Sequence, residues 1–406
     1  MSLIHKLDNK LRVAHLKCKS EVAYLGIGIN VGSSDERPEE YGISHFIEHM
    51  LFKGTEKRSN YKVISTLESV GGELNAYTTK EDTFIYTAFP KKYIGKAMEL
   101  LADILFNSTF PEVEMEKEKD VVIDEINSYK DNPAEVIFDE FEEQIFSGHP
   151  LGHNILGSEK TVKSITRTMI FDFIKRNYTC DKIVLFSYGD FSENKIFNLA
   201  EKYFNQNKFT SVSEATVRQE VKYNPEKKQI DENTYQAHSI IGNVAYSLYD
   251  KRRIPLYLLC NMLGGPAMNA RLNYQLRERN GIGYNIEAHY APYSNTGIVY
   301  IYWGSDENNI KRSNSIIAKE LKKITNTKLS EAALNRAKQQ YLGQMTIANE
   351  QKEGCFLNFG KSIMLYNKYN TMEEVVELVN AITAEEIQSI AKEVFDTKSI
   401  SSLLLL

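Results

Sequence analysis

The sequence predicts an α+β fold built from two similar domains, and three observations support this prediction. With 406 residues, the chain is too long for one ordinary compact core and suits two domains of about 200 residues each. One order of strand, helices and strand-rich segment occurs twice along it. Between the copies, residues 205–234 are polar, rich in lysine and weakly periodic. We therefore expect domains at 1–210 and 230–406, joined by a linker at 211–229, each with a mainly antiparallel sheet covered by helices.

Apolar periodicity and turn residues define the elements of the first copy. Ser59 is a favoured helix N-cap, and Gly71 and Gly72 favour the end of the same helix. Asn132 and Pro133 separate the last two helices. In order, we expect a strand at 22–31, helices at 43–52 and 59–70, an extended segment at 73–89, and helices at 91–107, 112–130 and 134–146.

The second copy repeats this order. We expect a strand at 239–249, helices at 254–263 and 268–279, two strands within 283–303, helices at 308–324 and 330–349, and a final strand at 403–406. Aligning Met50 and Leu51 with Met262 and Leu263 places Tyr257, Cys260 and Asn261 opposite His45, Glu48 and His49. Only the first copy therefore keeps metal-binding side chains.

Composition excludes several classes of protein. The net charge of −5 argues against nucleic acid or anionic lipid as the main partner. No apolar stretch is long enough for a signal peptide or a membrane-spanning helix, so we expect a cytoplasmic protein without a membrane partner. The four cysteines lie far apart and form no CxxC pair, which indicates reduced thiols: Cys18, Cys180, Cys260 and Cys355.

The segment His45-Phe46-Ile47-Glu48-His49 carries the strongest chemical signal. On a helix, its two histidines and Glu48 fall within one arc about 100° wide. Imidazoles four residues apart suit a tetrahedral zinc ion, and the carboxylate beside them can take a proton from zinc-bound water. A chance match on a helix surface is the alternative, but apolar neighbours surround the polar triplet, where unpaired polar groups would be costly.

A third zinc ligand is expected from the acidic helix at 112–130. Glu118 and Glu125 share one face but lie about 10 Å apart along the axis, so they cannot both bind one ion. Asp124 is rotated by about 100° from that face. We take Glu125 as the ligand and Glu118 as a residue that assists from outside the ligand set, although a solvated helix face remains the alternative for these acids.

A second histidine pair, His149 and His153, is interpreted differently. Pro150 and Gly152 lie between them and disfavour a helix, so the sequence predicts a loop there and not a second metal site.

These motifs resemble the inverted-motif zinc peptidases, in particular the family of mitochondrial processing peptidase, pitrilysin and insulin-degrading enzyme. The resemblance spans nearly the whole chain. It rests on HFIEHMLFKGT at 45–55, GGELNAYTTKEDTFIY at 71–86, EKDVVIDEI at 118–126 and LRERNGIGY at 276–284.

The resemblance implies a role for each matching residue. His45, His49 and Glu125 would bind one Zn²⁺ per chain, Glu48 would be the catalytic base, and Glu118 would assist it. Asn75 and Ala76 would lie on an edge strand that pairs with extended substrate, and Arg277 and Tyr284 would hold substrate or its carbonyl oxygen. From the residues alone, a plain strand start for Asn75 and Ala76, a helix-end arginine and a core tyrosine remain open.

The family resemblance also implies an assembly and an activity. Family members close as a clamshell of four such units, and this chain has two, so we expect a homodimer with enclosed chambers or a pairing with a related chain. The expected function is a zinc endopeptidase that cleaves short unfolded peptides or leader segments. The competing hypothesis is a non-catalytic scaffold or peptide-binding subunit of a larger complex.

Overall fold

The computed structural model describes residues 4–206, 208–209, 218–232 and 234–406. These residues form two compact units. The first unit takes the described residues within 1–127, 153–217 and 348–369, and the second takes those within 128–152, 218–347 and 370–406. Each unit therefore holds one segment that comes from the other half of the sequence, whereas we expected two continuous domains.

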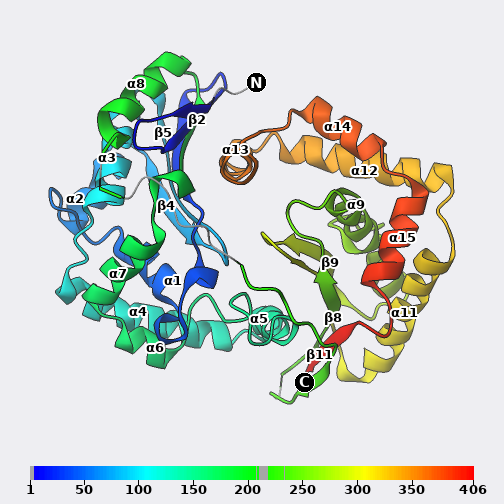
Figure 1. Cartoon of the computed structure of the whole chain (residues 1–406). Coiled ribbons are helices and arrows are strands. Elements are labelled where there is room, and N and C mark those ends of the chain that lie inside the picture. The colour runs from blue at the N-terminus through cyan, green and yellow to red at the C-terminus, as the bar shows by residue number, and fades with distance from the viewer. Residues whose placement is uncertain (1–3, 207, 210–217, 233) are drawn as a thin grey trace. The chain divides into compact units, whose positions relative to one another are not determined.

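A six-stranded sheet in the order β1-β2-β6-β3-β5-β4 forms the centre of the first unit (Figure 1). Its strands are β1 (Ile4–Lys6), β2 (Arg12–Lys17), β3 (Val22–Ile29), β4 (Glu73–Thr78), β5 (Thr83–Pro90) and β6 (Ile183–Gly189). Only β2 and β6 pair in parallel, and β4 lies at one edge of the sheet. The helices assigned to this unit are α1 (Ile43–Met50), α2 (Asn60–Glu68), α3 (Ile94–Asn107), most of α4 (Glu112–Lys130), α6 (Glu159–Ser164), α7 (Arg167–Asn177), α8 (Glu193–Phe204) and α13 (Lys352–Tyr366).

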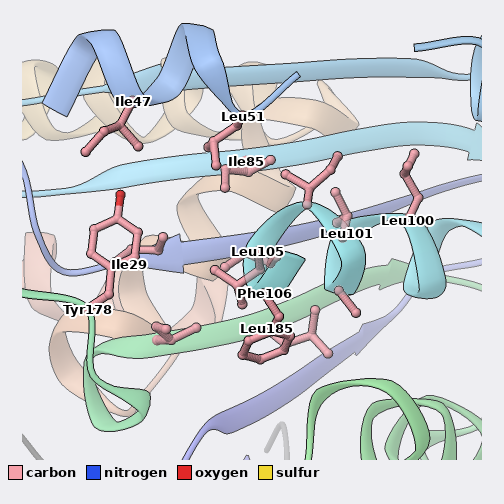
Figure 2. Packing of buried hydrophobic residues seen from close by; sticks show 14 of the residues in the cluster. Ile29, Ile47, Leu51, Ile85, Leu100, Leu101, Leu105, Phe106, Tyr178 and Leu185 are labelled. Carbon is pink, nitrogen blue, oxygen red and sulfur yellow. The ribbon is translucent and has the colours of Figure 1, made fainter. Parts of the chain in front are cut away.

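The core of the first unit holds α1 in place. Ile47 and Leu51 face the same apolar cluster as Ile29 of β3 and Ile85 of β5, and Figure 2 shows them directed toward one another. All four side chains are almost completely buried. Because one face of α1 is fixed in this way, its polar residues are held on the opposite side.

The opposite face of the sheet is covered by α13, which comes from the second half of the sequence. Phe356 of α13 stacks on Phe186 of β6, with ring centroids 4.6 Å apart. Gly360 permits this close packing, since a Cβ there would lie only 2.3 Å from the Phe186 ring. The helix therefore belongs to the first unit in packing, although it follows the second unit's elements in sequence.

The second unit contains a five-stranded sheet in the order β7-β11-β8-β10-β9. Its strands are β7 (Lys227–Ile230), β8 (Ala237–Ala245), β9 (Tyr284–Pro292), β10 (Gly297–Ser305) and β11 (Ser401–Leu405). Only β7 and β11 pair in parallel. Its helices are α5 (Pro133–Ile145), α9 (Arg253–Gly264), α10 (Arg271–Asn273), α11 (Ile310–Asn326), α12 (Glu331–Ala348), α14 (Met372–Asn380) and α15 (Ala384–Val394).

The α+β fold class is confirmed, with differences in detail. The first expected helix, at 43–52, ends at Met50. The helix expected at 268–279 was wrong in its start and its type, because α10 begins only at Arg271 and continues as a π-helix at Tyr274–Glu278. Of the expected linker at 211–229, residues 211–217 lie outside the described residues, and β7 begins within its last part.

Two further expectations concern the thiols and the membrane. All four cysteines are free. In the part of the chain that the structure describes, no helix combines the length and apolar character needed to cross a bilayer.

Candidate metal centre

Two helices bring three potential metal ligands together in the first unit. His45 and His49 lie one turn apart on α1, and their ring centroids are 4.5 Å apart. Glu125 of α4 lies 3.7 Å from His45, measured from Oε1 to Nε2, and 3.5 Å from His49, measured from Oε2 to Nε2. Across the described residues, this is the one group of at least three His, Cys, Asp or Glu side chains whose ligand atoms, here within 4.8 Å of one another, could share an ion.

Glu118 fixes the orientation of the His49 ring. Its Oε1 lies 2.9 Å from Nδ1 of His49, and its Oε2 lies 2.5 Å from the ammonium group of Lys53. When Nδ1 donates its hydrogen to Glu118, Nε2 keeps a free lone pair directed toward Glu125. A carboxylate behind a ligating histidine is a common feature of metal sites, because it fixes the tautomer and makes the imidazole more basic.

The two histidines titrate differently. Burial, assisted by the charge of His49, lowers the pKa of His45 to about 4, so its imidazole is neutral near pH 7. Its Nδ1 is buried and has no hydrogen-bond partner among the residues that the structure describes. Burial also acts against the charged form of His49, but the hydrogen bond and charge of Glu118 outweigh it and raise the pKa of His49. A metal cation and a proton would compete for Nε2 of His49, so metal binding should weaken as the pH falls.

These residues fit a zinc ion. Two imidazole nitrogens and one carboxylate oxygen are a donor set typical of catalytic zinc, which leaves one position for water or substrate. Glu118 is already engaged by His49 and Lys53, so Glu125 is the one acid of the ligand set within the described ranges.

Glu48 lies beside the metal ligands and faces a pocket. Its Oε2 accepts a hydrogen bond of 2.6 Å from the Thr78 hydroxyl. Burial raises the pKa of Glu48 above the ordinary value, although the Thr78 hydrogen bond opposes this rise. Glu48 therefore has the environment of a proton acceptor whose pKa is tuned upward from that of an exposed carboxyl.

A pocket of about 390 Å³ opens next to this cluster. Glu48, His49 and Glu118 line one part of it, and Asn75 and Ala76 of β4 line another. The edge strand β4 therefore borders the same pocket as His49, one of the three candidate ligands.

The N-terminus of α1 is held by a buried carboxylate, Glu36. Its two oxygens accept hydrogen bonds of 2.8 Å from the backbone amides of Gly42 and Ser44. Nε2 of His153 lies 3.0 Å from the same carboxylate, and the His153 ring stacks on Tyr41 at 3.8 Å. His153 is confirmed as part of a loop, and in this way the loop stabilises the start of the helix that carries His45 and His49.

Replacing Glu36 by alanine is expected to destabilise the first unit. The change leaves two buried amides and His153 without their acceptor, and each buried unpaired group costs about 1–3 kcal/mol, which gives about 3 kcal/mol or more in total. For a unit of this size, that corresponds to a fall in Tm of roughly 6–12 °C. Differential scanning calorimetry would measure it, with exposed Glu39→Ala as the control, and equal Tm values for the two variants would contradict the assignment.

The structure brings most of the predicted site residues together. His45, Glu48, His49, Asn75, Ala76, Glu118 and Glu125 lie around one pocket or metal cluster of the first unit. Arg277 and Tyr284 belong to the second unit, where Arg277 lies in the π-helix and Tyr284 begins β9. Both side chains are more than half exposed.

Sequence reasoning missed the residues that support this site. Lys53 follows the end of α1, four residues after His49, and its contact with Glu118 depends on how α4 packs against this segment. Thr78 and Glu36 gave no such signal, because their partners lie on other elements.

Comparisons with known proteins match the chain throughout its length. A family model described as Insulinase (Peptidase family M16) matches residues 12–159, and one described as Peptidase M16 inactive domain matches residues 164–341. A Bacillus subtilis protein named an uncharacterized zinc protease, YmxG, is 31% identical over 371 residues, which cover 91% of this chain and 90% of that protein. The mitochondrial-processing peptidase subunit beta of Saccharomyces cerevisiae is 30% identical over 418 residues, which cover 98% and 90%.

A solved structure shares the fold. The crystal structure of a protease from Helicobacter pylori superposes with a TM-score of 0.92 at 18% identity and covers 100% of this chain and 99% of that one.

Proposed function

Because the chain belongs to the insulinase family of peptidases, family M16, and is a zinc metallopeptidase of that family, we propose that it is an endopeptidase that cleaves short unfolded peptides or leader segments. The observation that supports this most strongly is the convergence of His45, His49 and Glu125 to within 4.8 Å, with Glu48 on the same helix as the two histidines.

In this proposal, His45, His49 and Glu125 would hold one zinc ion. When bound, zinc would supply a Lewis acid for the scissile carbonyl and the attacking water. Glu118 keeps His49 oriented through Nδ1, and Lys53 compensates the charge of Glu118 in that position.

Glu48 acts as the proton carrier. Thr78 engages Oε2, which leaves Oε1 to accept the proton of the attacking water. The same carboxyl then donates that proton to the nitrogen of the leaving amine, so one residue serves as base and acid in turn. Its raised pKa suits both steps, because a carboxyl of ordinary acidity would be a poorer donor in the second.

Replacing Thr78 by valine is expected to shift the pH dependence of the reaction. The Thr78 hydrogen bond favours ionised Glu48, so its removal raises the pKa of Glu48 further. Because Glu48 must be ionised to accept a proton, activity should be lost at a higher pH on the acid side. A profile of kcat/KM against pH would show the acid limb moved upward, with exposed Thr168→Val as the control. An unchanged or downward-moved acid limb would contradict this role.

Substrate would bind in extended form along the free edge of β4. Backbone groups near Asn75 and Ala76 would pair with the peptide, which gives affinity with little dependence on its sequence. This mode of binding favours unfolded peptides over folded proteins, because only an extended segment can add a strand to the edge.

Arg277 and Tyr284 would assist the reaction from the second unit of a partner chain. We propose a homodimer in which these exposed donors of one copy complete the zinc site of the other, within an enclosed chamber. Pairing with a related chain is the alternative assembly, and the solution mass of the purified protein would distinguish a dimer from a monomer. A cytoplasmic location also stays a prediction.

Chelation tests the proposed activity. Cleavage of a quenched library of short peptides should stop when zinc is removed with a chelator and return when one equivalent of zinc is added. If the chain is instead a non-catalytic scaffold, no cleavage is expected with or without zinc. Cleavage that persists at full rate in the zinc-free protein would contradict the peptidase mechanism.

A further inference from the structure

The two units share a strand order that makes their elements comparable. The order β2-β6-β3-β5-β4 in the first sheet corresponds to β7-β11-β8-β10-β9 in the second. In both, only the first two strands of this series pair in parallel. The helix that follows β5 is α3, and the helix that follows β10 is α11, so these two helices are equivalent.

In the first unit, α8 follows β6 and covers the sheet beside α3 (Figure 1). Ile196, Ala200 and Phe204 form its buried stripe, spaced four residues apart. Phe204 contacts Phe106 of α3, with ring centroids 6.0 Å apart. The strand residues of this cluster, such as Leu185 of β6, are fully buried.

In the second unit, the equivalent place is a groove. We call it the α11 groove; it measures about 1050 Å³ and lies between α11, the end of α15 and the face of β7, β11 and β8. Ile241 of β8 and Leu404 of β11 remain partly exposed in it, unlike Leu185 in the first unit.

The groove also contains an unsatisfied polar atom. Oγ of Ser239, on β8, is buried and has no hydrogen-bond partner in the described structure. Ser239 is only 4% exposed, so bulk water reaches it poorly. A buried hydroxyl of this kind is usually paired in a completed interface.

Positive charge surrounds the apolar floor. Lys227 of β7, Lys322 of α11 and Lys392 of α15 line the groove, and none of them has an acidic partner within the described ranges. Asp396 is the single acid that lines it, and its Oδ1 already accepts a hydrogen bond from the backbone amide of Lys398. The groove therefore favours a partner with acidic residues beside an apolar stripe.

We propose that the α11 groove binds an acidic amphipathic helix of another polypeptide, in the place that α8 occupies in the first unit. The length is suitable: α8 has 12 residues, which span about 18 Å, and α11 with its 17 residues is longer. In the first unit, Oε1 of Glu201 on α8 lies 3.0 Å from Nε2 of His5, on the edge strand β1. Lys227 on the edge strand β7 offers the second unit a comparable contact.

A designed peptide tests this proposal. The probe is a fluorescein-labelled peptide with the sequence of residues 192–206 of this chain, in which Lys195→Glu and Lys202→Glu make it acidic. The full chain carries Glu48→Gln so that the peptide is not consumed, and anisotropy measures binding. We expect saturable binding, weakened at least tenfold by Lys227→Glu with Lys322→Glu and abolished by Ala318→Trp, which fills the groove from α11. Ala332→Trp, on the exposed start of α12, is the matched control and should bind normally.

The outcomes separate this surface from the zinc site. A peptide of the same composition, with Ile196, Ala200 and Phe204 moved to break the stripe, should not bind. Absence of binding by the probe, equal binding by the two peptides, or binding unaffected by Ala318→Trp would overturn the proposal. Binding of laurate at the groove without binding of the probe would likewise overturn it in favour of a lipid site. Loss of zinc should leave probe binding unchanged, so failure here does not bear on the peptidase activity.

Discussion

Replacing Glu48 by glutamine should lower kcat/KM about 10³-fold while the protein keeps its zinc. Glutamine has almost the same size and can still accept the Thr78 hydrogen bond, but it cannot accept the proton of the attacking water. General acid–base catalysis contributes about 10²–10⁴-fold to a reaction, and Glu48 is assigned both the base and the acid step. The measurement is cleavage of a quenched peptide, with zinc content determined by mass spectrometry.

The control for this prediction is Glu116→Gln. Glu116 lies on α4 with a side chain that is 72% exposed, so its replacement should change neither cleavage nor zinc content. Cleavage by the Glu48 variant at the rate of the unmodified protein would exclude Glu48 as the proton carrier. Loss of zinc in that variant would instead indicate that Glu48 is itself a zinc ligand.

Three substitutions on α4 should have sharply different effects on zinc. Glu125→Ala removes a ligand and should leave the protein without bound zinc at micromolar zinc concentrations. Glu118→Ala removes only the carboxylate behind His49 and should weaken zinc binding about 10–100-fold. Asp124→Ala, on an exposed position of the same helix, should have no effect.

This series tests whether Glu125 or Glu118 is the zinc ligand, which helical periodicity alone does not decide. Competition against a fluorescent zinc chelator would measure the three affinities. If Glu118→Ala lost zinc completely and Glu125→Ala retained it, the assignments of ligand and supporting residue would be reversed.

The part of the candidate site on α1 could be predicted because it depends on local spacing. His45, Glu48 and His49 share a face of one helix whatever the rest of the chain does, and the separation of Glu118 from Glu125 excludes a shared ion by helix geometry alone. The duplicated order of elements was likewise readable from the positions of apolar runs and glycines. Both predictions used signals in the sequence that are periodic and short in range.

The supporting contacts could not be predicted, because they depend on tertiary packing. Glu36 meets His153 across 117 residues, and neither residue belongs to a periodic pattern that would pair them. The placement of α13 depends on how Gly360 fits against Phe186, a matter of shape that its apolar residues do not reveal. The π-helix at Tyr274–Glu278 has hydrogen bonds one residue longer in register than those of an α-helix, and apolar periodicity does not distinguish the two.

X-ray absorption spectroscopy at the zinc edge of the purified protein tests the central claim most directly. The account predicts one zinc per chain with a first shell of light atoms only, at about 2.0–2.2 Å, and with the outer-shell signature of two imidazoles. The free thiols of the chain provide the contrast. A sulfur ligand at about 2.3 Å, or the signature of a single imidazole, would contradict a site made of His45, His49 and Glu125.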